Sequence, residues 1–184
     1  MNILAIGNSF SQDATRYLTQ IAAARGVYFR TVNLYIGGCP LVRHYNNLLH
    51  DARAYSLEYG GETTGFYVSI RQALRARKWD VITLQQVSHK SPRYETYQPY
   101  LDVLAAECRR LCPDAKLFIH QTWAYEDGSK RLCEEMNIPD QNVANMMVPR
   151  LQRLRTINHG TSKMSAAGRC CGLSTCFCLF RPLF

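Results

Sequence analysis

Short apolar runs alternate with segments of helical periodicity along the first 120 residues of the chain. The apolar runs are rich in β-branched and aromatic residues and predict strands at 2–7, 27–35, 80–85 and 116–120. Apolar side chains at helical spacing predict the helices between them: one from Ser11 or Asp13 to a stop at Gly26, then 41–55, 69–78 and 94–112.

Two regions do not follow this alternation. The segment 57–66 is irregular, and Gly60-Gly61 within it predicts the turn of a small hairpin. After about residue 145 the periodicity decays: 146–155 is compatible with one more helix, and 156–184 shows no period of either kind. We therefore divide the chain into an α/β domain at 1–145 and a tail at 146–184.

Strands that alternate with helices predict an α/β fold with three layers, in which a parallel, flavodoxin-like sheet has helices on both faces. Ligands of such sheets bind at the carboxyl ends of the strands. Polar clusters fall at the ends of all four predicted strands: Asn8-Ser9, Gly37-Gly38, residues 85–91 and Gln121-Thr122. Because these ends share one edge, the pattern predicts a functional site there.

Ser9 is the chemically most informative residue of this edge. A serine at a strand-to-helix turn exposes its hydroxyl, and the N–H groups of the incoming helix point the same way. Such a turn offers a nucleophile and part of an oxyanion hole. The alternative is that Ser9 only caps the helix, and the local sequence fits both roles.

Charge is distributed unevenly along the chain. The net charge is +8, but all 14 Asp and Glu precede residue 141, whereas six of the 22 Lys and Arg follow it. The basic character therefore belongs to the tail, and no motif for reading nucleic acid occurs, so we expect no nucleic-acid partner. The apolar stretches fall short of the roughly 18 residues of a spanning helix. No secretory leader is evident, so we expect no membrane association and a cytoplasmic location.

The eight cysteines fall into two groups. Those of the body are scattered, as is usual for buried small side chains. Those of the tail, Cys170, Cys171, Cys176 and Cys178, lack the paired C-x-x-C spacing of structural zinc sites. We therefore predict no bound metal and no cofactor.

Three blocks of the body together resemble the SGNH hydrolases, the GDSL-like esterases. The run Gly7-Asn8-Ser9-Phe10-Ser11 resembles their first block, with Asn in place of the usual Asp before Ser. Gly37-Gly38 resembles the second block, and residues 84–89 lie where the family carries its third. The resemblance covers about residues 1–145, and the stretch 120–123 matches an uncharacterised bacterial branch. It implies hydrolysis of an acyl or acetyl ester, on a small molecule or a carbohydrate, through an acyl-enzyme at Ser9.

The resemblance also implies further site residues. The oxyanion donors would be the N–H groups of Ser9 and Gly38 and a side-chain amide, for which Gln85 and Gln86 both qualify because the third block has no Asn. The alternative for both amides is hydrogen bonding to neighbouring loops. Residues placed to bind substrate are Asn8, Ser88, His89, Gln121 and Trp123.

No catalytic base is evident. His89 and His120 lie at the predicted edge, and His89 is either a substitute base or a loop residue. His44 and His50, on a predicted helix, fit surface or packing roles.

The family takes its base from a late Asp-x-x-His segment, and no Asp or Glu follows Asp140 here. The abrupt change in composition favours a truncated or frame-shifted product that lacks the last strand and helix of the fold; genuine divergence of the tail is the alternative. A non-catalytic module that binds carbohydrate or another ligand is therefore the second functional hypothesis.

Overall fold

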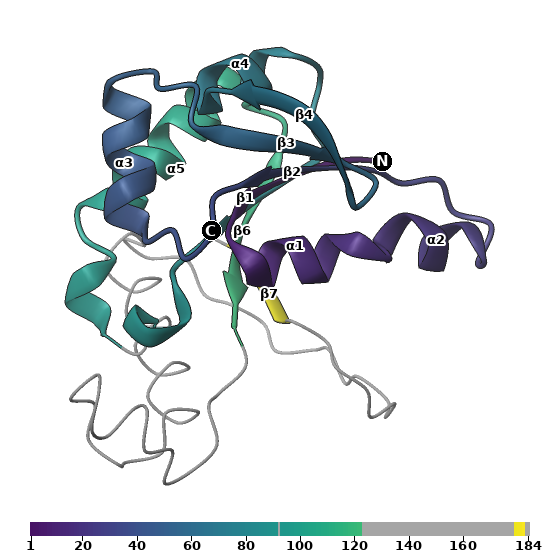
Figure 1. Ribbon diagram of the computed structural model, residues 1–184, viewed down its shortest axis with the longest axis horizontal. Coiled ribbons are helices and arrows are strands. Elements are labelled where there is room, and N and C mark those ends of the chain that lie inside the picture. Colours follow the sequence, from purple (N-terminus) through teal and green to yellow (C-terminus); the bar gives the residue numbers. More distant parts are fainter. Residues whose placement is uncertain (92, 123–178, 183–184) are drawn as a thin grey trace, which may run out of the picture.

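The computed structural model describes residues 1–91, 93–122 and 179–182, and it contains a seven-stranded sheet with the order β4-β3-β2-β1-β5-β6-β7. All four strands predicted from the apolar runs are present, and they pair in parallel at the centre of the sheet. The strands are β1 Asn2–Gly7, β2 Arg30–Tyr35, β3 Tyr55–Tyr59, β4 Glu62–Val68, β5 Val81–Gln85, β6 Lys116–Gln121 and β7 Leu179–Pro182. The α/β class is confirmed (Figure 1).

The sheet as a whole is mixed, and the four predicted strands form its parallel part. β3 runs antiparallel to β2 and to β4, and β7 runs antiparallel to β6. The β3–β4 pair is the predicted hairpin, and Gly60 and Gly61 turn it with φ values of +59° and +91°. A two-residue turn of this kind reverses the chain, so these strands cannot be parallel. β7 adds a strand from the tail; the other residues of the tail lie outside the described part.

Helices cover both faces of the sheet. The helices are α1 Ser9–Arg16, α2 Leu18–Ala23, α3 Leu41–Leu49, α4 Ile70–Arg75 and α5 Tyr100–Leu111, with 3₁₀ turns η1 Ser88–Lys90 and η2 Tyr94–Thr96. α1 and α2 lie on one face, and α3, α4 and α5 lie on the other (Figure 1). The segment 94–112 divides into η2 and α5 because Pro99 has no N–H to donate inside a helix. In the described part, no helix is long and apolar enough to cross a membrane.

The main core lies between the sheet and the layer of α3, α4 and α5. Its fully buried side chains come from β1, β2, β3 and β5 and from the inner faces of these helices: Leu4, Ile6, Leu34, Leu41, Leu48, Tyr55, Ile70, Leu74, Ile82, Leu84, Leu101 and Leu104. β1 is central and buried, so it delivers its carboxyl end to the middle of the sheet edge.

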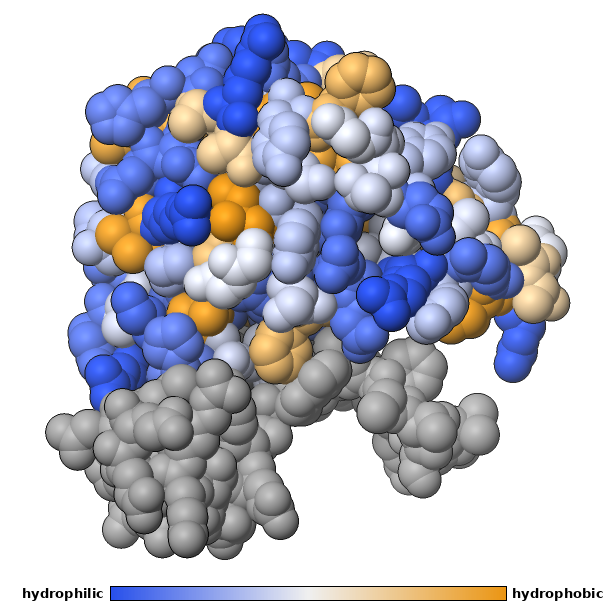
Figure 2. All heavy atoms as spheres, in the orientation of Figure 1, coloured by the Kyte–Doolittle hydropathy of each residue, from blue (hydrophilic) through white to orange (hydrophobic). Residues whose placement is uncertain are grey.

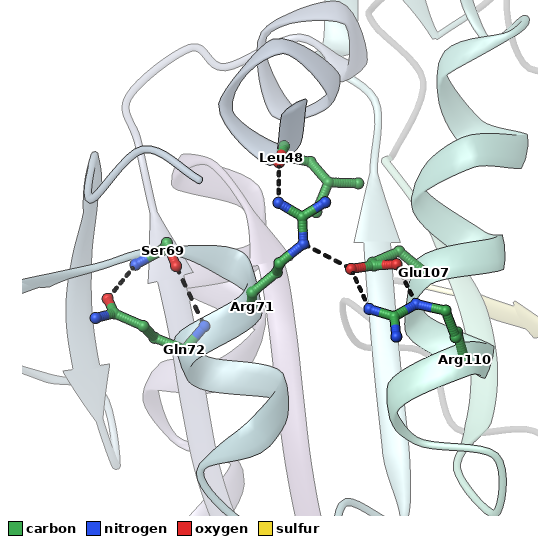
Figure 3. Close-up of polar contacts among 6 residues, drawn as sticks. All are labelled: Leu48, Ser69, Arg71, Gln72, Glu107 and Arg110. Atoms are coloured by element: carbon green, nitrogen blue, oxygen red, sulfur yellow. Dashed lines mark hydrogen bonds and ion pairs between the residues drawn. The ribbon is translucent and has the colours of Figure 1, made fainter. Parts of the chain in front are cut away.

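Arg71 ties the three helices of this layer together (Figure 3). Its guanidinium donates to Leu48 O at the end of α3, at 2.6 Å, and to the Glu107 carboxylate of α5, at 2.7 Å. Glu107 also accepts from Arg110, whose hydrogen bonds hold the pKa of the Glu107 carboxyl at about 2. α4 itself begins with a reciprocal pair of hydrogen bonds between Ser69 and Gln72.

Candidate functional site

Ser9 stands at the tip of β1, as the first residue of α1, and its side chain is exposed. Within the described ranges, no hydrogen bond engages the hydroxyl or the backbone N–H of Ser9. The first N–H groups of a helix have no partner inside the helix, and they carry its partial positive charge. Among the described residues, the turn therefore presents a hydroxyl and an N–H group without hydrogen-bond partners.

The N-cap of α1 is Asn8, which corrects the expectation that Ser11 or Asp13 starts this helix. Asn8 has an extended backbone, and its Oδ1 accepts from the N–H of Phe10 at 3.1 Å. Its side chain is almost fully buried, and the capping residue of α1 is therefore Asn8 and not Ser9. Ser9 therefore does not cap α1, which was the alternative interpretation of this residue.

Gln85, at the end of β5, forms hydrogen bonds with the turn at residues 8–11, which we call the Ser9 turn. Its Oε1 accepts from the N–H groups of Asn8 at 3.3 Å and Ser11 at 3.1 Å, and its Nε2 donates to Asn8 Oδ1 at 2.7 Å. Gly7 makes the approach possible, because a Cβ there would overlap Gln85 Oε1 and would lie 2.6 Å from Ser11 Oγ. Of the two glutamines, Gln85 is the one that contacts the Ser9 turn.

The loop after β2 lies against the same turn. Asn8 Nδ2 donates to Cys39 O at 3.3 Å, which joins the Gly37-Gly38 loop to the end of β1. Gly38 has φ +58°, open space where a Cβ would lie, and an N–H without a hydrogen bond in the described part. Its left-handed backbone favours glycine. The free N–H groups of Ser9 and Gly38 thus come from two loops that Asn8 connects.

Gln86 connects a second pair of loops. Its Oε1 accepts from the N–H of Leu41, at the start of α3, at 3.0 Å, and its Nε2 donates to Thr96 O at 2.9 Å. Both glutamine amides therefore bind neighbouring loops, the alternative that the sequence left open. The part of either amide in an oxyanion hole stays a prediction.

The other residues predicted to bind substrate lie at the same edge of the sheet and differ in how deeply they are buried. Ser88 is buried and His89 is half-buried, both on η1, and Gln121 is half-buried at the end of β6. Trp123 lies outside the described residues. His120 is the register partner of Gln85, and burial lowers its pKa to about 4, so it is neutral near pH 7.

A buried cluster lies behind the Gly38 loop. The His44 ring stacks on Tyr55, its Nδ1 lies 2.9 Å from the Tyr55 hydroxyl, and Cys39 Sγ lies 3.6 Å from the same nitrogen. Burial lowers the pKa of His44 to about 3 and raises that of the Cys39 thiol to about 12. A neutral histidine and a protonated thiol cannot work as a nucleophile pair, so the packing role expected of His44 fits this environment.

Side chains with hydroxyl groups form a row across β2, β3 and β4, beginning next to Gly7 at the end of β1. The periodicity of the sequence did not predict this row. Gly7, Tyr35, Ser56 and Tyr67 are register neighbours across β1, β2, β3 and β4, so their side chains share one face. The Tyr35 hydroxyl lies 3.3 Å from the position of a Cβ on Gly37, and Tyr67 is 63% exposed. In the view of Figure 2, side chains of intermediate hydropathy gather near the centre of the described part. We call Tyr35, Ser56 and Tyr67 the tyrosine row.

Metal ligands are not gathered anywhere in the described part: no group of three or more His, Cys, Asp or Glu side chains there could hold an ion.

Comparisons with known proteins agree with this architecture. A family model described as a domain of unknown function, DUF4886, matches residues 2–154. A crystal structure of a DUF4886 family protein from Bacteroides uniformis is 34% identical and superposes with a TM-score of 0.73. The alignment covers 85% of this chain and 63% of that one, so the chain spans less than two thirds of that protein.

A second solved structure extends the likeness of fold. It is a proposed SGNH hydrolase from Slackia heliotrinireducens, 21% identical, with a TM-score of 0.56 over 83% of this chain and 72% of that one. At this identity the likeness shows an SGNH-like fold alone. No curated protein matches the chain.

Proposed function

We propose that this chain, which belongs to the DUF4886 family, carries an SGNH-type serine ester hydrolase site with Ser9 as its nucleophile. One observation carries the proposal: the exposed Ser9 hydroxyl has no hydrogen bond in the described part, and it lies on the same turn as a free N–H donor. The Gly38 loop, which Asn8 fastens to this turn, offers another free N–H. This combination fits covalent acyl transfer.

The reaction would follow the chemistry of acyl transfer. Ser9 Oγ attacks the carbonyl carbon of the ester, and the N–H groups of Ser9 and Gly38 stabilise the oxyanion that forms. The C–O bond to the alcohol then breaks, the alcohol leaves with the proton that Ser9 gave up, and water hydrolyses the acyl-enzyme. Asn8 and Gln85 keep the two loops in place. His89, on η1 at this edge, is the candidate that the sequence offers for the base.

The tyrosine row supports an ester carried by a carbohydrate. Its rings present flat apolar faces, and its hydroxyls are neutral donors and acceptors. Since the row starts at Tyr35, whose hydroxyl lies close to Gly37, and continues to the exposed Tyr67, a sugar ring bonded to the reacting ester would lie over it. The proposed substrate is therefore a neutral acyl or acetyl ester of a small alcohol or sugar, and the reaction needs no cofactor, metal or nucleic acid.

Hydrolysis of p-nitrophenyl acetate tests the nucleophile. We expect Ser9→Ala to reduce the rate to that of the buffer, because no other exposed hydroxyl lies on this turn. Thr64→Ala, which removes an exposed hydroxyl from β4 outside the tyrosine row, is the control and should retain the parent rate. Equal activity of Ser9→Ala and parent would refute Ser9 as the nucleophile. An inactive but folded parent that binds sugar would favour the non-catalytic module.

The tyrosine row has a matched test on one strand. Tyr67 and Phe66 are consecutive, 63% and 69% exposed, and on opposite faces of β4. Tyr67→Ala should raise KM for a mono-acetylated methyl glucoside by about fivefold, which corresponds to ~1 kcal/mol of ring contact. It should leave p-nitrophenyl acetate unaffected, and Phe66→Ala should change neither substrate. Equal effects of the two variants would remove the carbohydrate assignment.

A further inference from the structure

Glu58, on β3, is a buried carboxylate close to the Ser9 turn. It is 3% exposed, its Oε1 accepts from Gln12 Nε2 at 2.5 Å, and its Oε2 accepts from Asn33 Nδ2 at 2.7 Å. Among the residues that the structure describes, no cation forms a salt bridge with it. Burial of a carboxylate against neutral partners costs free energy that an apolar side chain would avoid. A role in orientation would account for a group that stability alone does not favour.

The carboxylate sets the direction of the hydrogen bonds around it. An ionised carboxylate only accepts, so the amides of Gln12 and Asn33 must both turn their NH₂ groups toward Glu58. Asn33 Oδ1 then faces away from Glu58 and lies 2.8 Å from Ser11 Oγ. An oxygen in that position can accept the Ser11 proton, so Glu58 fixes the orientation of Asn33 and, through it, gives Ser11 an acceptor on β2.

Ser11 has two acceptors within reach and a single proton to donate. Asn8 O lies 2.9 Å from its Oγ, close to the 2.8 Å of Asn33 Oδ1. If Asn33 were free to rotate its amide, Ser11 could bond to the backbone of its own turn instead. With Asn33 held by Glu58, the hydroxyl keeps an acceptor on β2, and this hydrogen bond ties the first turn of α1 to the sheet.

Both sides of the Ser9 turn are then held. Gln85 fixes the N–H groups of Asn8 and Ser11 on one side, and Glu58 fixes Gln12 directly and Ser11 through Asn33 on the other. We propose that Glu58 is a positioning residue for Ser9: it directs the hydrogen bonds that orient the first turn of α1. This inference rests on the proposed function of Ser9.

Glu58→Gln tests the inference, because it keeps the shape of the side chain but places an NH₂ group against one of the two amide donors. We expect kcat for p-nitrophenyl acetate to fall about tenfold with KM nearly unchanged. The rate of Ser9 labelling by a fluorophosphonate should fall by the same factor. Glu62→Gln, at an exposed carboxylate of the same hairpin, is the control and should match the parent.

A double-mutant cycle separates positioning from general destabilisation. Because Glu58 acts on the turn through Ser11, the effects of Glu58→Gln and Ser11→Ala on the labelling rate should overlap, and the double variant should label little more slowly than the slower single variant. If Glu58→Gln does not fold, Gln12→Ala, at a half-buried side chain, removes one contact of the carboxylate and should lower kcat in the same direction.

The outcomes distinguish the two proposals. A parent that labels at Ser9, together with a folded Glu58→Gln protein that labels at the parent rate, would overturn the role of Glu58 and leave the function of Ser9 intact. Additive effects in the cycle would also overturn it. A folded parent without labelling or hydrolysis would remove the proposed function and this inference with it.

Discussion

Removal of the Asn8 side chain should damage both the stability and the chemistry of the site. Its Oδ1 accepts from Phe10 N and from Gln85 Nε2, and its Nδ2 donates to Cys39 O. Asn8→Ala removes the cap of α1 and leaves the Gln85 amide and the Cys39 carbonyl without these partners. The side chain is 1% exposed, so water reaches these groups poorly.

The expected loss follows from these contacts. An N-cap contributes about 1 kcal/mol. Each buried polar group left without a partner costs about 1–3 kcal/mol, although some of this cost is recovered where the vacated space admits water. Asn8→Ala should therefore lower the free energy of unfolding by about 3 kcal/mol, which corresponds to a fall of roughly 6–12 °C in Tm for a domain of this size.

Urea denaturation followed by circular dichroism measures this loss, with fluorophosphonate labelling as a second readout. Asn8→Asp is the informative partner variant, because it keeps the capping oxygen but turns a second oxygen toward Cys39 O. It should recover part of the stability that Asn8→Ala loses. Asn46→Ala, at an exposed side chain of α3, is the control and should stay within about 0.5 kcal/mol of the parent. A loss below 1 kcal/mol for Asn8→Ala would refute the role of Asn8 as the link between these loops.

Three further predictions concern other parts of the fold. Gly61→Ala should lower the free energy of unfolding by about 3 kcal/mol, because the new Cβ would lie 2.6 Å from the backbone of α1 and the residue has φ +91°. Gly26→Ala, at φ +70° but in open space, should lower it by only about 1 kcal/mol. Equal losses for the two variants in thermal melting would contradict this. Because hydrogen bonds from Arg110 lower the pKa of Glu107 to about 2, its stabilisation is complete above about pH 5 and is lost as the pH falls toward 2. Glu107→Gln should flatten that part of the acid-denaturation curve, and an unchanged slope would argue against the pair. The buried Cys39 thiol, with its pKa raised to about 12, should react with iodoacetamide only on unfolding, and rapid native alkylation of the Cys39 peptide would disprove its burial.

The central strands and the place of Ser9 could be predicted from the sequence, because both follow from local patterns. An apolar run that ends in Gly and leads into a helix predicts β1 and the serine that follows it, and this local pattern does not depend on the rest of the fold. The Gly60-Gly61 hairpin was predicted on the same local grounds. The direction of β3 relative to β2 was not, since the pairing of strands is decided by long-range contacts.

The details of the site required the tertiary structure. Ser11 and Asp13 are as good as Asn8 as caps by local preference, and Gln85, 77 residues away in the sequence, favours Asn8 by bonding to it. The tyrosine row arises from the register of four strands, which no single periodicity encodes. The buried Glu58 lies in the segment that looked irregular, and its partners come from α1 and β2.

The site of covalent modification by a fluorophosphonate shows most directly whether Ser9 is an activated nucleophile. The full chain would be labelled near pH 7.5, digested and analysed by mass spectrometry, beside the Ser9→Ala variant and heat-denatured parent. We expect a single adduct on Ser9 in the native parent and none in either control. Labelling at another serine, or no labelling of the folded parent, would contradict the assignment of Ser9 as an activated nucleophile.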